Sequence, residues 1–385
     1  MLSALHTIRE ERYLMDYQYI QHICEKFKIG GTLTDCVLIN TGHINKTYRA
    51  DFTMPDGTIQ RFTVQAINTY VFPDPKAIMD NISGVTEHIR RKVIEEGGDP
   101  QREAMHFLQT DTGEYFHWES DKTVWRIYHY IDHTSTYNKA TDLQMIYNAG
   151  IGFGKFQRRL ADYPMEKLNI TIADFHNTPK RLMNLWDAAQ KDTEGRSYRV
   201  QEELQFFKEH EKLFSKLQML ADTGKIPLRV THNDTKYNNI LIDDNTAEAV
   251  CVIDLDTVMP GLSAYDYGDA IRFAAASCNE DETDLDLVYM KKGNFESFTA
   301  GFLGECRGFF SDEELDTMAL GAVTITAEIA SRFLEDYLRG DKYFRIGRDE
   351  QNLDRARCQI KLAKSMLDNF EYMQKTIDQY KSSAS

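Results

Sequence analysis

The hydrophobic pattern of this chain changes near residue 131, and that change limits the possible folds more than any other feature. Residues 31–72 are rich in Thr, Val, Ile and Phe and alternate around "MPDGT" at 54–58, whose Asp-Gly pair is a strong hairpin signal. Strand-like segments return at 105–109 and 114–131. Residues 1–131 are therefore predicted to form a small β-rich domain, with a short helix at 12–28 ahead of the first strand.

One helix is expected inside this β-rich domain, ended by the Gly-Gly pair at 97–98. Its apolar residues recur at spacings of three and four, as on one face of a helix. They are Ile78, Ile82, Val85, Ile89 and Val93.

Residues 132–385 are predicted to form a larger, mainly helical domain. One expected helix carries apolar residues from Val200 to Leu217, and the last 100 residues or so contain few Pro or Gly breaks. The exception is a β island at 239–256, which is typical of a hairpin with its turn at 243–246. The predicted fold class is α+β, with a β-rich N-terminal lobe and a helical C-terminal lobe.

Charge and cysteine usage narrow the class of function. The chain has 385 residues and a formal net charge of −15. This balance argues against binding to nucleic acid or to an anionic membrane surface, which both depend on Lys and Arg. The six cysteines are scattered without a CxxC pair, which favours reduced thiols. We expect a cytoplasmic, soluble protein without a signal peptide or a membrane span.

The candidate chemistry lies in "THNDTKYNNILID", residues 231–243. Asp234 and Asn239 are five residues apart in a tight loop, and Asp254 follows the returning strand of the hairpin. Phosphoryl transfer needs a carboxylate to accept the proton of an attacking hydroxyl, and hard oxygen ligands to hold Mg²⁺ against ATP. Asp234 is the candidate base, Asn239 and Asp254 the metal ligands, and Lys236 a cation for the transferring phosphate. The alternative is a polar turn with a capping Asp or Asn.

These residues resemble the catalytic loop and the metal-binding Asp of the protein-kinase-like fold, in the branch of the aminoglycoside and choline kinases. "VIDLDTVMPGL", "YDYGDAIRF", "RFLEDYLRGDKYF" and "NLDRARCQ" resemble segments of the N-acetylhexosamine 1-kinase family. The resemblance implies a bilobal fold and transfer of the γ-phosphate of ATP, with Mg²⁺, to the anomeric hydroxyl of N-acetylglucosamine or N-acetylgalactosamine.

The resemblance also implies roles for further residues. Asp256 would support the metal. In "NTGHINKTYRA" at 40–50, Gly42 and Asn45 belong to the loop over the nucleotide phosphates. The adenine would lie near Tyr128 and Ile131, bound through backbone groups.

Four residues are implied to contact the sugar, and two acidic residues to support the catalytic loop. For Arg332, an ion pair with Asp336 is the alternative to a sugar contact. Asp266 and Asp269, in "YDYGD", are expected to brace the catalytic loop. The implied sugar contacts are His43, Asp234, Arg332 and Tyr343.

One position departs from the general kinase pattern. The third strand, "RFTVQAI", carries Gln65 where the fold usually has a Lys paired with a helix Glu. Gln65 can donate hydrogen bonds to phosphate but adds no charge, and Glu87 is the nearest candidate for the helix partner. Two other functions therefore stay open: a kinase of another small alcohol (an aminoglycoside, choline or homoserine), and a nucleotide-binding pseudokinase.

Overall fold

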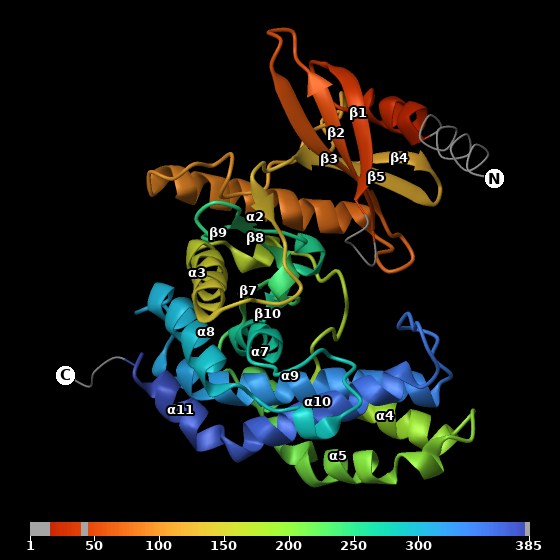
Figure 1. Cartoon of the computed structure of the whole chain (residues 1–385), viewed down its shortest axis with the longest axis vertical. Coiled ribbons are helices and arrows are strands. Elements are labelled where there is room, and N and C mark those ends of the chain that lie inside the picture. The colour runs from red at the N-terminus through yellow and green to blue at the C-terminus, as the bar shows by residue number, and fades with distance from the viewer. Residues whose placement is uncertain (1–15, 40–44, 382–385) are drawn as a thin grey trace. The chain divides into compact units, whose positions relative to one another are not determined.

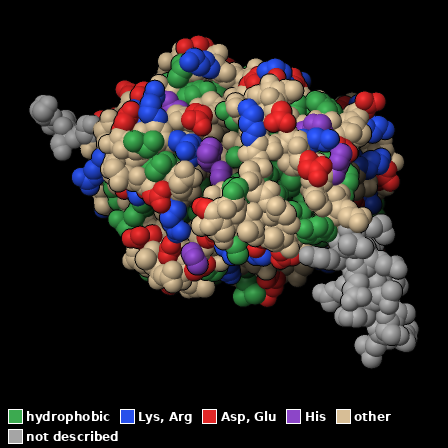
Figure 2. Space-filling model, turned by 90° about the horizontal axis from the view of Figure 1, so that it is seen from above, with side chains coloured by type: hydrophobic (Ala, Val, Ile, Leu, Met, Phe, Trp, Pro, Cys, Tyr) green, Lys and Arg blue, Asp and Glu red, His purple; other side chains and the backbone are tan. Residues whose placement is uncertain are grey.

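The structure is a computed structural model of the chain and describes residues 16–39 and 45–381 (Figure 1). The chain forms two compact units. The first is Met1–Thr134 with Glu166–Thr171, and the second is Ser135–Met165 with Ile172–Ser385. None of the helices in the described ranges is both long and apolar enough to cross a membrane. On the face drawn in Figure 2, acidic and basic side chains are interspersed.

The first unit contains a five-stranded antiparallel sheet in the order β1-β2-β3-β5-β4. The predicted hairpin joins β2 to β3: Gly57 has φ 83°, and the Asp56 carboxylate accepts hydrogen bonds from the N–H and hydroxyl of Thr58 at 2.9 and 2.6 Å. The strands are β1 (Thr32–Ile39), β2 (Lys46–Thr53), β3 (Ile59–Ile67), β4 (His117–Ser120) and β5 (Thr123–His129).

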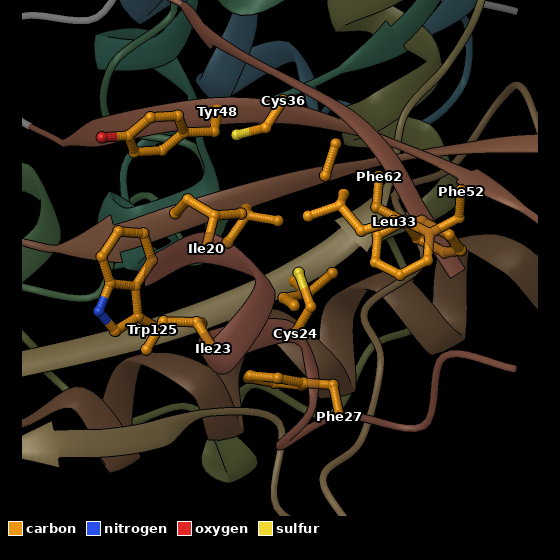
Figure 3. Packing of buried hydrophobic residues seen from close by; sticks show 13 residues of the cluster. Ile20, Ile23, Cys24, Phe27, Leu33, Cys36, Tyr48, Phe52, Phe62 and Trp125 are labelled. Atoms are coloured by element: carbon orange, nitrogen blue, oxygen red, sulfur yellow. The ribbon is translucent and has the colours of Figure 1, made fainter. Parts of the chain in front are cut away.

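One face of this sheet packs on a helix formed by residues 16–24. The helix contributes Ile20, Ile23 and Cys24 to a buried apolar cluster, and the sheet contributes aromatic side chains that include Phe62 and Trp125 (Figure 3). The expected strand at 105–109 is wrong, because only an isolated bridge joins Phe107 to Tyr128 there.

The single long helix of the first unit's described residues is α2 (Pro75–Glu95), as the apolar spacing predicts. Asp74 accepts a hydrogen bond from the Ala77 N–H at 3.0 Å, and Pro75 occupies the first turn, where its missing N–H costs nothing. Gly97, with φ 76°, follows the last turn. All five residues of the predicted apolar stripe are buried.

The second unit is mainly helical and carries the predicted hairpin, β8 (Ile240–Asp243) with β9 (Ala249–Val252). The Asp243 carboxylate accepts the N–H groups of Asn245 and Thr246 at 2.9 and 3.0 Å, which closes the turn. The expected helix at 200–217 is divided at Ser215. The helices are α3 (Leu143–Arg159), α4 (Thr178–Lys191), α5 (Gln201–Phe214), α6 (Lys216–Asp222), α7 (Ser263–Ala274), α8 (Lys292–Glu305), α9 (Asp312–Leu338), α10 (Gln351–Asp368) and α11 (Phe370–Asp378).

The helices α7 and α9 approach each other at glycines. A Cβ atom on Gly268 would lie 2.5 Å from the backbone carbon of Gly321, and one on Gly321 would lie 2.1 Å from the carbonyl oxygen of Ala264. These contacts leave no room for a side chain at either glycine. The close approach fixes α7, which carries the acidic residues of "YDYGD".

Candidate active site

The buried carboxylate of Asp266 on α7 holds the loop at 232–236. Its two oxygens accept the main-chain N–H groups of His232 and Asn233, each at 2.7 Å. The Thr235 hydroxyl donates to the Asp266 carbonyl at 2.5 Å. The expected bracing role therefore fits Asp266, whereas the Asp269 carboxylate pairs with Arg272 at 2.9 Å.

His232 lies inside this loop and forms hydrogen bonds through both ring nitrogens. Its Nε2 lies 2.9 Å from the Ile253 carbonyl, which only accepts, so Nε2 carries the proton. Its Nδ1 is then free to accept the Asp234 N–H at 3.2 Å. The ring is buried against Phe153 and Phe156. His232 thus joins the loop to the end of β9.

The residue before Asp234 has a left-handed backbone. Asn233 has φ 64°, and its side chain is fixed by a hydrogen bond from Nδ2 to the Thr257 carbonyl at 2.9 Å and by one from the Thr231 hydroxyl at 3.0 Å. A Cβ atom on Gly261 would lie 2.3 Å from Thr231 Oγ1 and 2.8 Å from Asn233 Oδ1. The loop shape therefore depends on glycine at 261.

Asp234 forms an ion pair with Lys236, with Nζ 2.9 Å from Oδ1 and 3.2 Å from Oδ2. Burial acts to raise the pKa of Asp234, but the charge and hydrogen bond of Lys236 lower that pKa below its ordinary value. Burial acts to lower the pKa of Lys236, and Asp234 raises it above its ordinary value. The pair is therefore charged at neutral pH, and the Asp234 side chain keeps 24% of its surface exposed.

Asn239 connects this pair to the far end of the hairpin. Its Nδ2 donates to the Asp234 carbonyl at 2.8 Å and to Asp234 Oδ2 at 3.2 Å, and its own carbonyl accepts the Ile253 N–H at 2.9 Å. Asp254 follows directly, exposed and with φ 60°, and Asp256 is buried two residues on. Across residues 16–39 and 45–381, no cluster of three or more His, Cys, Asp or Glu side chains is arranged to bind a metal.

In the first unit, Gln65 lies in a row with Thr47 of β2 and Arg126 of β5, which are its partners in register. Its Oε1 accepts two hydrogen bonds from the Arg126 guanidinium, at 2.9 and 2.7 Å, and its Nε2 donates to Thr47 Oγ1 at 2.9 Å. Arg126 is only 2% exposed and also contacts Met79 of α2. Glu87, by contrast, is exposed and faces Arg90 at 3.8 Å.

The other predicted nucleotide contacts lie in the same unit. Asn45 Oδ1 accepts the Asn68 N–H at 3.0 Å, at the start of β2. Tyr128 lies on β5 and packs on Phe107, and the Ile131 carbonyl accepts the Thr134 hydroxyl at 2.7 Å. Gly42 and His43 lie outside the described residues.

Two of the predicted sugar contacts lie together in the second unit. The Arg332 guanidinium is framed by three rings, those of Phe175, Tyr343 and Phe344, whose centroids are 5.6, 6.0 and 5.5 Å away. The alternative prediction for Arg332, an ion pair with Asp336, is wrong. The Asp336 carboxylate instead accepts the main-chain N–H groups of residues 342, 343 and 344. Tyr343 is 65% exposed beside the guanidinium.

Two residues of interest were not identified from the sequence. Arg126 was readable as a charged residue inside the otherwise apolar strand "TVWRIYH", but its partner Gln65 lies 61 residues away. His176 lies 3.0 Å from the Asn233 carbonyl through Nε2, across 57 residues. No local pattern points to His176, because it precedes α4 without a motif of its own.

The comparisons with known proteins identify the family of this chain. Residues 92–294 match the model of the Phosphotransferase enzyme family (APH), which is more than half of the chain. The chain therefore belongs to this family.

Solved structures show the same fold. An aminoglycoside phosphotransferase from Alicyclobacillus acidocaldarius has a TM-score of 0.60 at 11% identity, over 93% of this chain and 96% of that one. Amicoumacin kinase hAmiN has a TM-score of 0.58 at 12% identity, over 94% of this chain and 96% of that one. A microcompartment-associated aminopropanol kinase has a TM-score of 0.58 at 12% identity, over 93% of this chain and 98% of that one. The predicted α+β kinase-like fold is confirmed.

Proposed function

We propose that this protein is an ATP- and Mg²⁺-dependent kinase that phosphorylates the anomeric hydroxyl of an N-acetylhexosamine. The observation that carries the proposal is the charged Asp234–Lys236 pair with Asn239 bonded to it, in a member of a phosphotransferase family. A carboxylate with a lowered pKa is ionised at neutral pH and is able to accept a proton from a substrate hydroxyl.

The reaction follows from the roles of these groups. Asp234 orients the C1 hydroxyl and takes its proton as the oxygen attacks the γ-phosphorus. The bond from that phosphorus to the β,γ-bridging oxygen breaks, and ADP leaves with the bonding electrons. Lys236 offsets the negative charge of the transferring phosphoryl group. Asp234 then releases its proton to solvent, and the product is the sugar 1-phosphate.

The donor atoms around the loop suit a hard divalent cation. Asn239 uses its amide nitrogen toward Asp234, which leaves its amide oxygen as a ligand atom, and Asp254 presents an exposed carboxylate. Asn239 and Asp254 would hold Mg²⁺, with Asp256 as support, and the ion supplies charge neutralisation on the triphosphate when bound. The hAmiN structure was obtained with AMP-PNP and Ca²⁺, which supports a nucleotide and a divalent ion on this fold.

The nucleotide is proposed to use the first unit. Asn45 and the segment before it, with Gly42, would cover the phosphates, and backbone groups at Tyr128 and Ile131 would bind the adenine. Gln65 would offer the second N–H of its amide, since the first donates to Thr47 Oγ1 at 2.9 Å. Its Oε1 is already occupied by Arg126, so the amide is held in one orientation.

The acceptor is proposed to bind through Arg332 and Tyr343, and the contact by His43 stays a prediction. Within the described part of the chain, the Arg332 guanidinium has ring contacts but no hydrogen bond or ion pair. Its planar donors are therefore available for hydroxyl and acetamide oxygens, and the rings hold it in place.

A kinase of a small amino alcohol is the second candidate. The net charge of −15 and the aminopropanol kinase neighbour favour a cationic acceptor. Arg332 opposes it, because a cationic acceptor beside a guanidinium is repelled. A pseudokinase has less support, since a binding module without catalysis has no use for the Asp234–Lys236 pair.

The test is a product assay by phosphorus NMR. Purified protein is incubated with ATP, Mg²⁺ and N-acetylglucosamine or N-acetylgalactosamine, beside choline, homoserine, aminopropanol and an aminoglycoside. An acid-labile 1-phosphate formed by the wild type and not by Asp234→Asn supports the proposal. Turnover of an amino alcohol alone would replace it with the second candidate, and binding of ATP without turnover of any acceptor would favour the pseudokinase.

A further inference from the structure

His176 occupies a buried position behind the catalytic loop. It precedes the N-cap of α4, and its side chain is 9% exposed. Nε2 lies 3.0 Å from the carbonyl oxygen of Asn233, and Nδ1 lies 2.8 Å from Oε1 of Glu328 on α9, which is fully buried. One imidazole thus joins α9 to the peptide that enters Asp234.

The partners of His176 determine where its protons are. A carbonyl oxygen only accepts hydrogen bonds, so Nε2 carries a proton. The carboxylate oxygen Oε2 of Glu328 accepts the Thr178 hydroxyl at 2.6 Å, which leaves Oε1 to face Nδ1. Burial acts to lower the pKa of His176, but the Glu328 charge raises it above its ordinary value, and His176 keeps the pKa of Glu328 below its own ordinary value. Both shifts favour an imidazolium beside a carboxylate.

The groups that act on this pair come from three helices and from the loop. On α9, Arg332 acts to lower the pKa of His176, and Arg181 of α4 interacts with Glu328. On α7, burial raises the pKa of Asp266 and the nearby His176 acts against that rise, while the Tyr265 ring lies 5.5 Å from the imidazole. From the loop, the Asn233 carbonyl favours the cation. Glu328 outweighs Arg332 because it bonds the imidazole directly.

Every other polar group of Asn233 is also anchored. Its N–H is held by Asp266 at 2.7 Å and its side chain by the Thr257 carbonyl at 2.9 Å. In the peptide between Asn233 and Asp234, the Asp234 N–H donates to His232 Nδ1 at 3.2 Å, and His176 holds the carbonyl end. Without a donor, the carbonyl would be buried and unpaired, and only the longer Asp234 N–H bond to His232 would resist rotation of the peptide. A rotation there turns the Asp234 side chain away from its working direction.

We propose that the buried His176–Glu328 ion pair is a positioning device that holds the 233–234 peptide so that Asp234 meets the acceptor hydroxyl. The inference rests on the proposed phosphotransfer function, because it assigns His176 a role in that reaction. His176 does not touch substrate and acts only through the loop. The charge of His176 is present below its raised pKa and is lost as pH rises through it, so the device weakens on the alkaline side.

The variants are His176→Gln, which removes the charge, and Glu328→Gln, which keeps the shape and removes the anion. The matched control is His210→Gln on α5, where another imidazole bonds a backbone carbonyl, that of Phe206, at 2.8 Å. The readouts are kcat and KM between pH 6 and 10 and ¹⁵N NMR of the imidazoles in the wild type. Circular dichroism verifies that each variant is folded.

We expect the wild type to show both nitrogens of His176 protonated at neutral pH. We expect kcat of both variants to fall about tenfold to a hundredfold with KM for ATP nearly unchanged, the alkaline limb of Glu328→Gln to move to lower pH, and His210→Gln to match the wild type. A neutral His176 by NMR overturns the inference, even where a variant does not fold. So does a folded variant with unchanged kcat and pH profile. A wild type that turns over no acceptor overturns the proposed function, and this inference with it.

Discussion

The main-chain N–H of Ile253 donates a hydrogen bond to the carbonyl of Asn239 at 2.9 Å, which places the residue before Asp254 against the residue before β8. The bond continues the ladder of β8 and β9, in which Ile240 pairs with Val252. Two candidate metal ligands that are fifteen positions apart in sequence are thus carried by one hairpin.

Asp254→Asn should weaken the response to Mg²⁺. The amide keeps the oxygen but loses the charge, so we expect the Mg²⁺ concentration for half-maximal activity to rise by at least about tenfold. The measurement is a Mg²⁺ titration of kinase activity after treatment with EDTA. Wild-type activity that persists in excess EDTA would contradict the metal assignment.

Asp234→Asn should greatly slow turnover and preserve nucleotide binding. The amide cannot accept the hydroxyl proton, so we expect kcat to fall about 10²- to 10⁴-fold while the Kd for ATP changes little. An ADP-coupled assay and a calorimetric titration measure the two quantities. Asp222→Asn, at an exposed carboxylate at the end of α6, is the control. Wild-type kcat in Asp234→Asn would exclude Asp234 as the base.

Gln65→Lys, which introduces the lysine that kinases usually have on this strand, should destabilise the first unit. The ammonium group would meet the buried Arg126 guanidinium, which now donates to Gln65 Oε1 at 2.7 Å. Two like charges at that distance should lower the free energy of unfolding by about 3 kcal/mol. Denaturant titration measures the loss, and Gln65→Lys combined with Arg126→Gln should recover most of it. A stable single variant would show that the sheet relaxes around both cations.

Gly268→Ala should destabilise the second unit. The new Cβ would lie 2.5 Å from the backbone of Gly321, so α7 and α9 must separate, at a cost of about 2–3 kcal/mol. Gly304→Ala on α8 is the matched control, because a Cβ atom at that position would meet no neighbouring atom within 4 Å and Ala favours the helix by up to about 1 kcal/mol. Thermal unfolding of both proteins measures the contrast. Equal midpoints would mean that the helices are less closely held than this spacing requires.

The first unit should lose stability in mild acid. Burial, His106 and Arg90 lower the pKa of His129 to about 4, and the His106 ring stacks on it at 4.7 Å. The unfolded chain binds the proton near the ordinary pKa, so stability is full above about pH 6.5 and falls toward pH 4, by about 1–2 kcal/mol after allowing for solvent screening. Denaturant unfolding at pH 7.5 and 5.0 measures the slope. His129→Gln should reduce the difference in stability between the two pH values. An unchanged difference would mean that other groups cause the effect.

The predictable parts of the fold were those with local signals. The hairpin of β2 and β3, the helix α2 and the hairpin of β8 and β9 each have a turn or cap residue next to a regular apolar pattern. The short strands β7 (Arg229–Thr231) and β10 (Met259–Gly261) have none, because three residues are too few to show a period and their pairing spans the whole hairpin.

The site residues with a local sequence signal could likewise be predicted, and those without one could not. Asp234, Lys236 and Asn239 are within six residues of one another, so their spacing was readable and the structure connects them. His176 and Glu328 are 152 residues apart, and only folding brings them together. Arg126 needed the strand register as well as the sequence, since its relation to Gln65 depends on which residues of β3 and β5 face each other.

The Asp266 anchor of the loop and Tyr343, which is proposed to contact the acceptor, occupy different parts of the helical unit. Asp266 holds the loop from α7, whereas Tyr343 lies on the segment that follows α9 and contributes little to the buried core. Substitutions at that segment should therefore change which alcohol is accepted without disturbing the chemistry. A scaffold divided in this way can acquire new substrates through a few surface changes while its reaction stays the same.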